Sequence, residues 1–202
     1  AYVVIVRVTE SGSVTSYDEQ TITVNVTNVN EAPSVPVDVN AAPNSVPENS
    51  PAGTLVGITA SSTDPERTAV TYSLTNNAGG RFQINSTTGV VTVANGALLN
   101  FEATTSHTIT VRASDGVLIS SQTFTISVTD VNEAPVITSN GGGATASISV
   151  PENTTAVTSV TATDVDANST ITYSISGGAD AAKFSINPTT GVLSFIAAPD
   201  FE

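Results

Sequence analysis

Acidic side chains recur in a fixed order along this chain of 202 residues, which carries 18 Asp and Glu against 5 Lys and Arg. One Glu lies in "VPEN" at 46–49 and again at 150–153, and another ends "NFE" at 100–102 and "DFE" at 200–202. Carboxylate and amide oxygens are the ligands that calcium prefers, and it takes about six to eight of them. With no cysteine and one histidine, the composition does not favour zinc.

Further acids complete the recurring set. The stretch "VTNVNEAP" at 26–33 returns as "VTDVNEAP" at 128–135. Each unit also has a D-x-D-like pair after its second strand (64/66 and 164/166), and an acid follows the sixth strand (Glu10 and Asp115). Single pairs of this kind are common in solvated loops, but an ordered set repeated at one period indicates a cation site. The candidate ligands from this pattern are Glu10, Asn30, Glu31, Glu48, Asp64, Glu66, Glu102, Asp115, Asn132, Glu133, Glu152, Asp164, Asp166, Asp200 and Glu202.

These acids belong to a longer internal repeat. "TYSL" at 71–74 matches "TYSI" at 172–175, and "FQINSTTGVV" at 82–91 matches "FSINPTTGVL" at 184–193. All the offsets fall between 100 and 105 residues. A period of this length has the size of a domain, so we expect an array of small domains rather than a solenoid.

Each repeat unit is expected to be built from strands. In "TITVRA" at 108–113, apolar and polar residues alternate, which is typical of a strand with one buried face. The Thr-Thr-Gly turns place Gly89 and Gly191 where a positive φ is needed. About seven short strands per period and almost no helix predict an antiparallel β-sandwich.

The repeat boundaries divide the chain into three parts. Residues 1–33 correspond to the last two strands of one unit, residues 34–135 to a complete unit, and residues 136–202 to the first five strands of another. We therefore expect two periods of the repeat, with both ends of the chain falling inside a unit.

Composition limits the function classes. A net charge of -13 disfavours nucleic acid and anionic membranes as partners. We see no signal peptide and no apolar run long enough to span a bilayer. The single His107 has no nucleophile motif near it and is expected at the surface, so an enzyme is the least favoured reading.

The ordered set resembles the cadherin repeat, a seven-stranded Greek-key sandwich that binds about three calcium ions at each junction between domains. The family's boundary motif D-x-N-D-N-x-P is similar to D-V-N-E-A-P at 130–135 and N-V-N-E-A-P at 28–33. The resemblance adds Asp130 to the ligands. The family's L-D-R-E loop is similar to "LNFE" at 99–102 and "PDFE" at 199–202.

The sequence departs from the family pattern at several positions. Glu31 and Glu133 stand where the family has Asp, and Asn28 and Asn100 replace further Asp residues. These changes bear on the number of ions at a junction more than on calcium binding itself. The wording "VNEAP" looks more like bacterial cadherin-like repeats than animal ones.

The resemblance implies how the two junctions are composed. The second would collect Glu48, Glu102, Asp130, Asn132, Glu133, Asp164 and Asp166. The first would hold Asn30, Glu31, Asp64, Glu66 and Asp115, with its remaining places filled by Glu152, Asp200 and Glu202 of another copy. Without cations the carboxylates repel each other and the linker should flex, whereas Ca²⁺ should lock successive domains in line.

The favoured function is a calcium-stiffened extender segment of a long bacterial extracellular or cell-surface repeat protein, secreted and adhesin-like. In a first alternative, the chain is a filament subunit whose residues 1–33 complete residues 136–202 of a neighbouring copy by strand addition. Val3 and Ile5, on the other face of that first strand, then hint at an extra contact or are ordinary surface residues. A second alternative is an adhesion module for carbohydrate or protein, which the absence of Trp disfavours.

Overall fold

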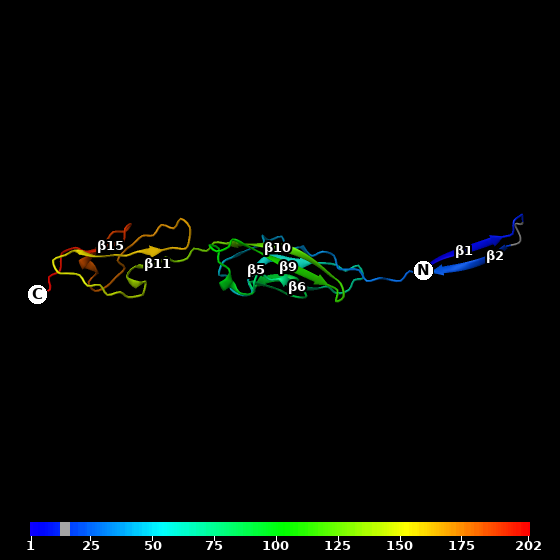
Figure 1. Cartoon of the computed structure of the whole chain (residues 1–202), viewed down its shortest axis with the longest axis horizontal. Helices are drawn as coiled ribbons and strands as arrows, with labels where there is room; N and C mark the ends of the chain where they lie inside the picture. The colour runs from blue at the N-terminus through cyan, green and yellow to red at the C-terminus, as the bar shows by residue number, and fades with distance from the viewer. Residues whose placement is uncertain (13–16) are drawn as a thin grey trace.

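The computed structural model describes residues 1–12 and 17–202, which form three β-structured parts in a row (Figure 1). The first part is a hairpin of β1 (Tyr2–Thr9) and β2 (Tyr17–Val24). A sandwich follows in the middle, and a smaller set of strands lies at the C-terminal end. The all-β prediction is confirmed.

The middle part is a Greek-key sandwich of two four-stranded sheets. Its eight segments are β3 (Val37–Asp38), β4 (Ser45–Pro47), β5 (Leu55–Ser61), β6 (Thr71–Asn76), β7 (Phe82–Ile84), β8 (Val90–Val93), β9 (Ser106–Ser114) and β10 (Ile119–Thr129). One sheet has the order β4-β10-β9-β6 and the other β3-β5-β8-β7. The segment that begins this unit contributes to both sheets, because β3 pairs with β5 in one sheet while β4 runs parallel to β10 in the other.

The core lies between these sheets. On β9 the side chains of Ile109, Val111 and Ala113 are fully buried, and on the facing sheet Phe82 and Val91 are buried as well. Because side chains alternate between the two faces of a strand, the polar residues between them remain near the surface. The apolar residues of the alternation predicted from the sequence are therefore the ones that pack between the two sheets.

The Thr-Thr-Gly turn is tied to a neighbouring strand. Gly89 has φ +70°, and a Cβ atom there would lie 2.0 Å from the carbonyl oxygen of Ala60. Ala60 donates its backbone N–H to Gly89 O at 2.9 Å. Gly191 repeats this arrangement with Val160, so both turns require glycine for conformation and for space.

The C-terminal part contains two small sheets. In one, β11 (Val136–Ile137) pairs with β13 (Ala162–Thr163); in the other, the order is β12 (Ala156–Ser159), β15 (Val192–Phe195) and β14 (Phe184–Ile186). Residues 172–175, which match β6 in sequence, form no strand. In the middle sandwich β6 is paired with β9, and the described residues of the C-terminal part contain no equivalent of β9.

Helix is limited to three short 3₁₀ turns in the described residues: η1 (Gly96–Leu98), η2 (Ser139–Gly141) and η3 (Ala181–Lys183). Within the same residues, the structure contains no helix with the length and apolar character needed to cross a membrane.

Candidate metal centre

Glu48 is the buried acid at the centre of the candidate site. It follows β4, and only 2% of its surface is exposed. Its Oε2 accepts the N–H of Phe101 at 2.9 Å, and its Oε1 accepts the N–H of Val131 at 2.9 Å. Such charge-assisted hydrogen bonds are stronger than neutral ones. One carboxylate thereby joins the loop after η1 to the chain that leaves β10.

Three further carboxylates gather around it. Glu102 lies in the loop after η1, Asp130 follows β10, and Glu133 lies in the linker to the next repeat. One ligand atom from each of Glu48, Glu102, Asp130 and Glu133 lies within 4.8 Å of all the others. Segments far apart in the sequence therefore converge on one acidic cluster at the end of the middle sandwich.

The next repeat contributes its D-x-D pair to the same place. Asp166 Oδ2 accepts the N–H of Glu133 at 2.8 Å, and Asp164 Oδ1 accepts the N–H of Asp166 at 2.9 Å. Asn132 donates its side-chain N–H to Glu133 O at 2.8 Å, which leaves Oδ1 as the acceptor end of this amide. The seven residues predicted for the second junction thus come from three places. Glu48 and Glu102 belong to the middle sandwich, three more residues lie in the linker, and Asp164 and Asp166 belong to the next repeat.

The electrostatics of the cluster favour a cation. Burial raises the pKa of Asp130, and the neighbouring Asp166 and Glu48 raise it further. Burial also raises the pKa of Glu133, as do Glu48, Asp166 and Glu102. Among the described residues, the buried oxygens Glu133 Oε2 and Asp166 Oδ1 have no hydrogen-bond partner. Buried polar atoms are normally paired, so a cation that accepts several oxygen ligands fits this site.

The first linker repeats the downstream half of this arrangement. Glu31 donates its N–H to Glu66 Oε2 at 3.3 Å, and Glu66 donates its N–H to Asp64 Oδ1 at 3.0 Å. Asp64 is buried, and its Oδ2 has no partner in the described part of the chain. Asn30 Nδ2 also donates to Asp115 Oδ2 at 2.8 Å, so this linker is fastened to the middle sandwich.

The C-terminal end repeats the upstream half. Glu152 Oε2 accepts the N–H of Phe201 at 3.1 Å, as Glu48 does with Phe101. Glu152, Asp200 and Glu202 are all exposed here, away from the cluster. Glu10 lies just beyond β1 and is exposed as well. The structure thus assembles one acidic cluster at the second linker, while the first linker and the C-terminal end each carry part of the same set of groups.

Comparison with known proteins decides the family. The family model described as "Cadherin domain" matches residues 43–129 and 146–202, which is more than half of the chain. This chain belongs to the cadherin family. Of the three parts, the cadherin model therefore covers most of the middle sandwich and most of the C-terminal part.

Curated cadherin relatives are much longer than this chain. Human cadherin-related family member 2 is 35% identical over 167 residues, covering 78% of this chain and 12% of the relative. Human protocadherin Fat 1 is 32% identical over 211 residues, covering all of this chain and 4% of the relative. These relatives are animal proteins, so the bacterial type of repeat stays a prediction.

Solved cadherin structures share the fold. The structure of mouse cadherin-23 EC22-24 has a TM-score of 0.63 at 22% identity, covering 98% of this chain and 64% of that one. Human protocadherin-24 EC1-2 has a TM-score of 0.56 at 24% identity, covering 84% of this chain and 79% of that one. The Greek-key prediction agrees with both.

One contributor to the cadherin junction was missing from the predicted ligands. Asn49 donates its Nδ2 N–H to Glu133 Oε1 at 3.2 Å and so orients one of the acids from the upstream side. Asn49 and Asn153 both have positive φ, 55° and 61°, which Asn tolerates better than most residues. The recurrence of Asn in both "VPEN" motifs was the available signal.

Asn100 stands where the family has an Asp ligand, but in this structure its side chain closes a turn. Its Oδ1 accepts the N–H of Ala103 at 2.6 Å, so this oxygen closes the local turn. A carboxylate has two oxygens and could close the turn with one while ligating with the other. The Asn therefore leaves one fewer anionic oxygen near the cluster.

Proposed function

We propose that the chain is a calcium-stiffened structural segment of a long extracellular or cell-surface repeat protein. The observation that carries the proposal is the convergence of Glu48, Glu102, Asp130 and Glu133 within 4.8 Å between two repeats. Asp166 extends this cluster from the far side of the linker. A calcium ion held by groups from both repeats would replace their repulsion with shared coordination.

Calcium suits this donor set better than other common ions. The donors are carboxylates and the side-chain oxygen of Asn132, with no Cys or His among them. Magnesium requires near-ideal octahedral geometry and usually keeps several waters, whereas calcium accepts six to eight oxygens in flexible geometry. The proposal also includes the number of ions that the family pattern implies, which is up to about three per junction.

The proposed role is mechanical rather than catalytic. The described residues place the acids at the ends of sandwiches and in linkers, which suits a spacer that controls the angle between domains. The long relatives and the tandem repeat favour a segment of an extended extracellular protein. The "VNEAP" motif in both linkers favours a bacterial adhesin-like stalk.

The test is calcium-dependent stability and shape. We expect calcium to raise the melting temperature and to give an extended, narrow distribution of interatomic distances in X-ray scattering, both reversed by a chelator. Magnesium at the same concentration should do much less. Glu133→Gln should weaken the calcium response at least about tenfold in affinity, because a ligating charge is removed.

A matched variant controls for net charge. Asp180→Asn removes a charge of the same sign from an exposed residue that pairs with Lys183 and lies far from the cluster in sequence. This variant should respond to calcium like the unaltered chain. The proposal fails if the chelator leaves both the melting temperature and the scattering unchanged.

A further inference from the structure

One sheet of the middle sandwich contains a permanent cation but no carboxylate. The strands β4, β10, β9 and β6 form this sheet, and Arg112 on β9 is the only Arg or Lys in them. The same four strands contain no Asp or Glu, although the whole chain carries 18 acids against 5 basic residues. The charge of this sheet is therefore opposite in sign to that of the chain as a whole.

Arg112 faces away from the core. Its neighbours Val111 and Ala113 are fully buried, and successive side chains of a strand point to opposite faces. On the outward side Arg112 stands between its register partners, Ser73 of β6 and Ser121 of β10. We call the outward residues around it the outer face, which consists of Thr71, Ser73, Thr108, Thr110, Arg112, Ile119, Ser121, Thr123 and Thr125.

The guanidinium of Arg112 has no acidic partner in the part of the chain that the structure describes. The ion pairs found there belong to Arg7 and Lys183. Within the same residues, the Nε atom of Arg112 is buried and has no hydrogen-bond partner. Buried polar atoms are normally paired. Because no hydrogen bond holds this Nε, the guanidinium can turn toward an incoming acceptor without breaking one at that atom.

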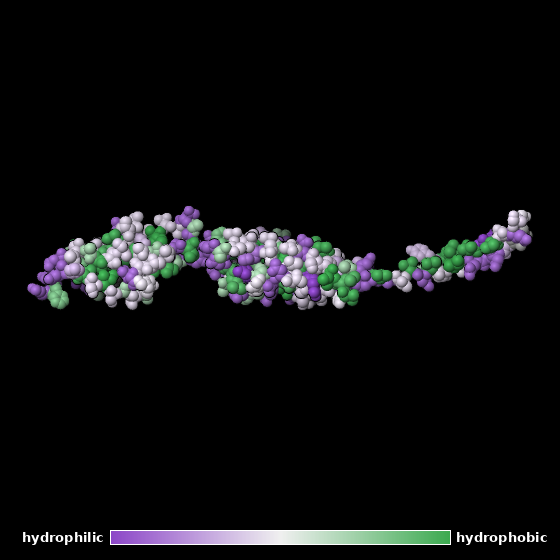
Figure 2. All heavy atoms as spheres, in the orientation of Figure 1, coloured by the Kyte–Doolittle hydropathy of each residue, from purple (hydrophilic) through white to green (hydrophobic). Residues whose placement is uncertain are grey.

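The composition of the outer face favours a saccharide over a protein as its partner. Apart from Arg112 and Ile119, its residues are all Ser or Thr. Pale side chains of intermediate hydropathy, the class that includes Ser and Thr, cover much of the middle sandwich in Figure 2. Protein interfaces are anchored by clusters of aromatic and large apolar side chains. A second copy of this chain would also bring a net charge of -13, which opposes its approach.

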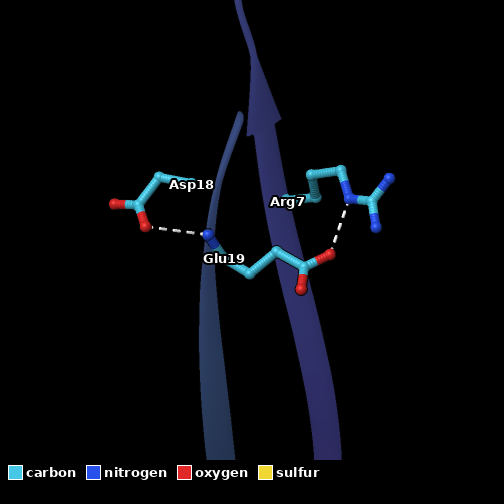
Figure 3. Close-up of polar contacts among 3 residues, drawn as sticks. All are labelled: Arg7, Asp18 and Glu19. Carbon is cyan, nitrogen blue, oxygen red and sulfur yellow. Dashed lines mark hydrogen bonds and ion pairs between the residues drawn. The ribbon is translucent and has the colours of Figure 1, made fainter. Parts of the chain in front are cut away.

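The β1–β2 hairpin shows how a carboxylate pairs with an Arg at this position. All eight β1–β2 pairs become β9–β10 pairs when 105 is added to the β1 number and 102 to the β2 number, so Arg7 is the equivalent of Arg112. Its register partner Glu19 is the equivalent of Ser121. Arg7 Nε donates to Glu19 Oε1 at 2.6 Å across the strands (Figure 3). The middle sandwich has a Ser in place of this acid, so a carboxylate for Arg112 must come from another molecule.

We propose that the outer face binds a saccharide that carries one carboxylate, and that Arg112 pairs with this carboxylate. A guanidinium presents its N–H donors in a planar fork that matches the two oxygens of a carboxylate. Ser73 and Ser121, on either side of Arg112, have hydroxyls that can both donate and accept hydrogen bonds, as sugar hydroxyls can. The chain has no Trp, so the ion pair and the hydroxyl groups hold the sugar in place of stacking on an indole ring.

Probes that differ in one group test the ligand class. Cellobiouronate has a carboxylate where cellobiose has a hydroxymethyl group, and an NMR titration that follows the Arg112 Nε–H and the amides of β9 and β10 measures both affinities. We expect cellobiouronate to bind at least about tenfold more tightly than cellobiose. N-acetylglutamate amide, which offers a protein-like carboxylate, should bind at least about threefold more weakly than cellobiouronate. Equal affinity of cellobiouronate and either other probe overturns the proposal.

Two substitutions of Arg separate the site from the net charge. Arg112→Gln removes the fork and its charge, and it should weaken the binding of cellobiouronate at least about tenfold. Arg67→Gln removes the same charge from an exposed residue in the loop between β5 and β6, and it should change the affinity less than about twofold. Equal losses in the two variants would mean that net charge alone attracts the disaccharide, which overturns the site.

Ser121→Glu tests the same site without removing Arg112. It supplies an acid at the place of Glu19 in the hairpin, so Arg112 should pair with it and the binding of cellobiouronate should weaken at least about tenfold. Thr125→Glu is the matched control, because it adds the same charge to the same face of β10 about 13 Å along the strand, and it should weaken binding less than about threefold. Undiminished binding by the Ser121→Glu variant contradicts the proposal.

All these titrations are made without calcium. The ion is removed with a chelating resin, because a soluble chelator would bring carboxylates of its own to Arg112. A failure of the calcium proposal therefore leaves the outcome at the outer face unaffected.

Discussion

At the residue scale, Glu48 combines two roles that can be separated by experiment. As an acceptor of two backbone N–H groups it braces the sandwich, and as a member of the acidic cluster it is a candidate ligand. A Gln side chain has one oxygen and one amide group, so it can accept only one of the two N–H groups. The buried donor left over would be unsatisfied.

Glu48→Gln should therefore lower the free energy of unfolding by about 1–3 kcal/mol even without calcium. Denaturant unfolding in calcium-free buffer measures this loss. Glu102→Gln is the matched control, because Glu102 belongs to the same cluster but is exposed. It should weaken calcium binding with little effect on the calcium-free protein. Equal stability of the Glu48→Gln variant and the unaltered chain would contradict the bracing role.

His107 is half-buried rather than at the open surface that the sequence suggested. Its Nε2 is buried without a partner in the described residues, and its ring lies 6.2 Å from that of Phe82. Burial lowers its pKa, and the charge of Arg81 lowers it further. The unfolded chain therefore binds a proton more readily than the folded one, and stability should fall as pH drops through the ordinary His pKa of roughly 6.5.

His107→Gln should remove this part of the pH dependence. The difference in melting temperature between pH 7 and pH 5 should be smaller in the variant than in the unaltered chain, in calcium-free buffers of equal ionic strength. The carboxylates respond to pH in both proteins alike, so the comparison isolates His107. An identical pH profile in the two proteins would mean that its protonation does not oppose folding.

At the element scale, the Thr-Thr-Gly turn should be far less tolerant of substitution than a glycine turn with open space around it. Gly89→Ala faces both a positive φ and the carbonyl oxygen of Ala60 at 2.0 Å from the new Cβ atom. Gly116→Ala has a positive φ of 101° but nothing within 4 Å, so it carries the conformational cost of about 1–2 kcal/mol alone. We expect Gly89→Ala to destabilise clearly more than Gly116→Ala in thermal unfolding. Equal losses would show that the close approach to β5 is relaxed easily.

The strands that could be predicted are those whose pattern depends on burial on one face. β9 and β10 alternate apolar and polar residues because one face meets the core, and the sequence shows that alternation directly. Residues 172–175 have nearly the same sequence as the start of β6 but form no strand, because a strand also requires a neighbour to pair with. Pairing partners are a property of the assembled fold and are invisible in a local pattern.

The candidate site shows the same division. The repeated acids could be found because both copies carry them at one period, and the structure places seven of the predicted ligands in or on either side of one linker. The recurrence of Asn in both "VPEN" motifs marks Asn49, but its contact with Glu133 and the turn-closing role of Asn100 could not be predicted, since each depends on which atom a side chain directs at its neighbours. The number of ions per junction and the exact repeat boundaries stay predictions.

At the scale of the whole molecule, the shape should respond to salt only when calcium is absent. The repulsion among the linker carboxylates is screened over about 30 Å at 0.01 M salt and about 8 Å at 0.15 M. Raising sodium chloride across this range in calcium-free buffer should shift the scattering-derived distance distribution, because the repulsion that drives the two repeats apart becomes weaker. In calcium the same change should have little effect. A shift of equal size in both conditions would contradict an electrostatic joint.

The hydrogen bonds on either side of the second linker also determine what kind of change this joint tolerates. Val131 is fastened to the middle sandwich through Glu48, and Glu133 is fastened to the next repeat through Asp166. Only Asn132 lies between these two anchor points. Substitutions in this stretch alter individual contacts, but inserting or deleting one residue changes the distance between the anchors and rotates one domain against the other. The number of residues in the linker therefore sets the relative orientation of the two domains. This orientation should survive many side-chain substitutions but no insertion or deletion.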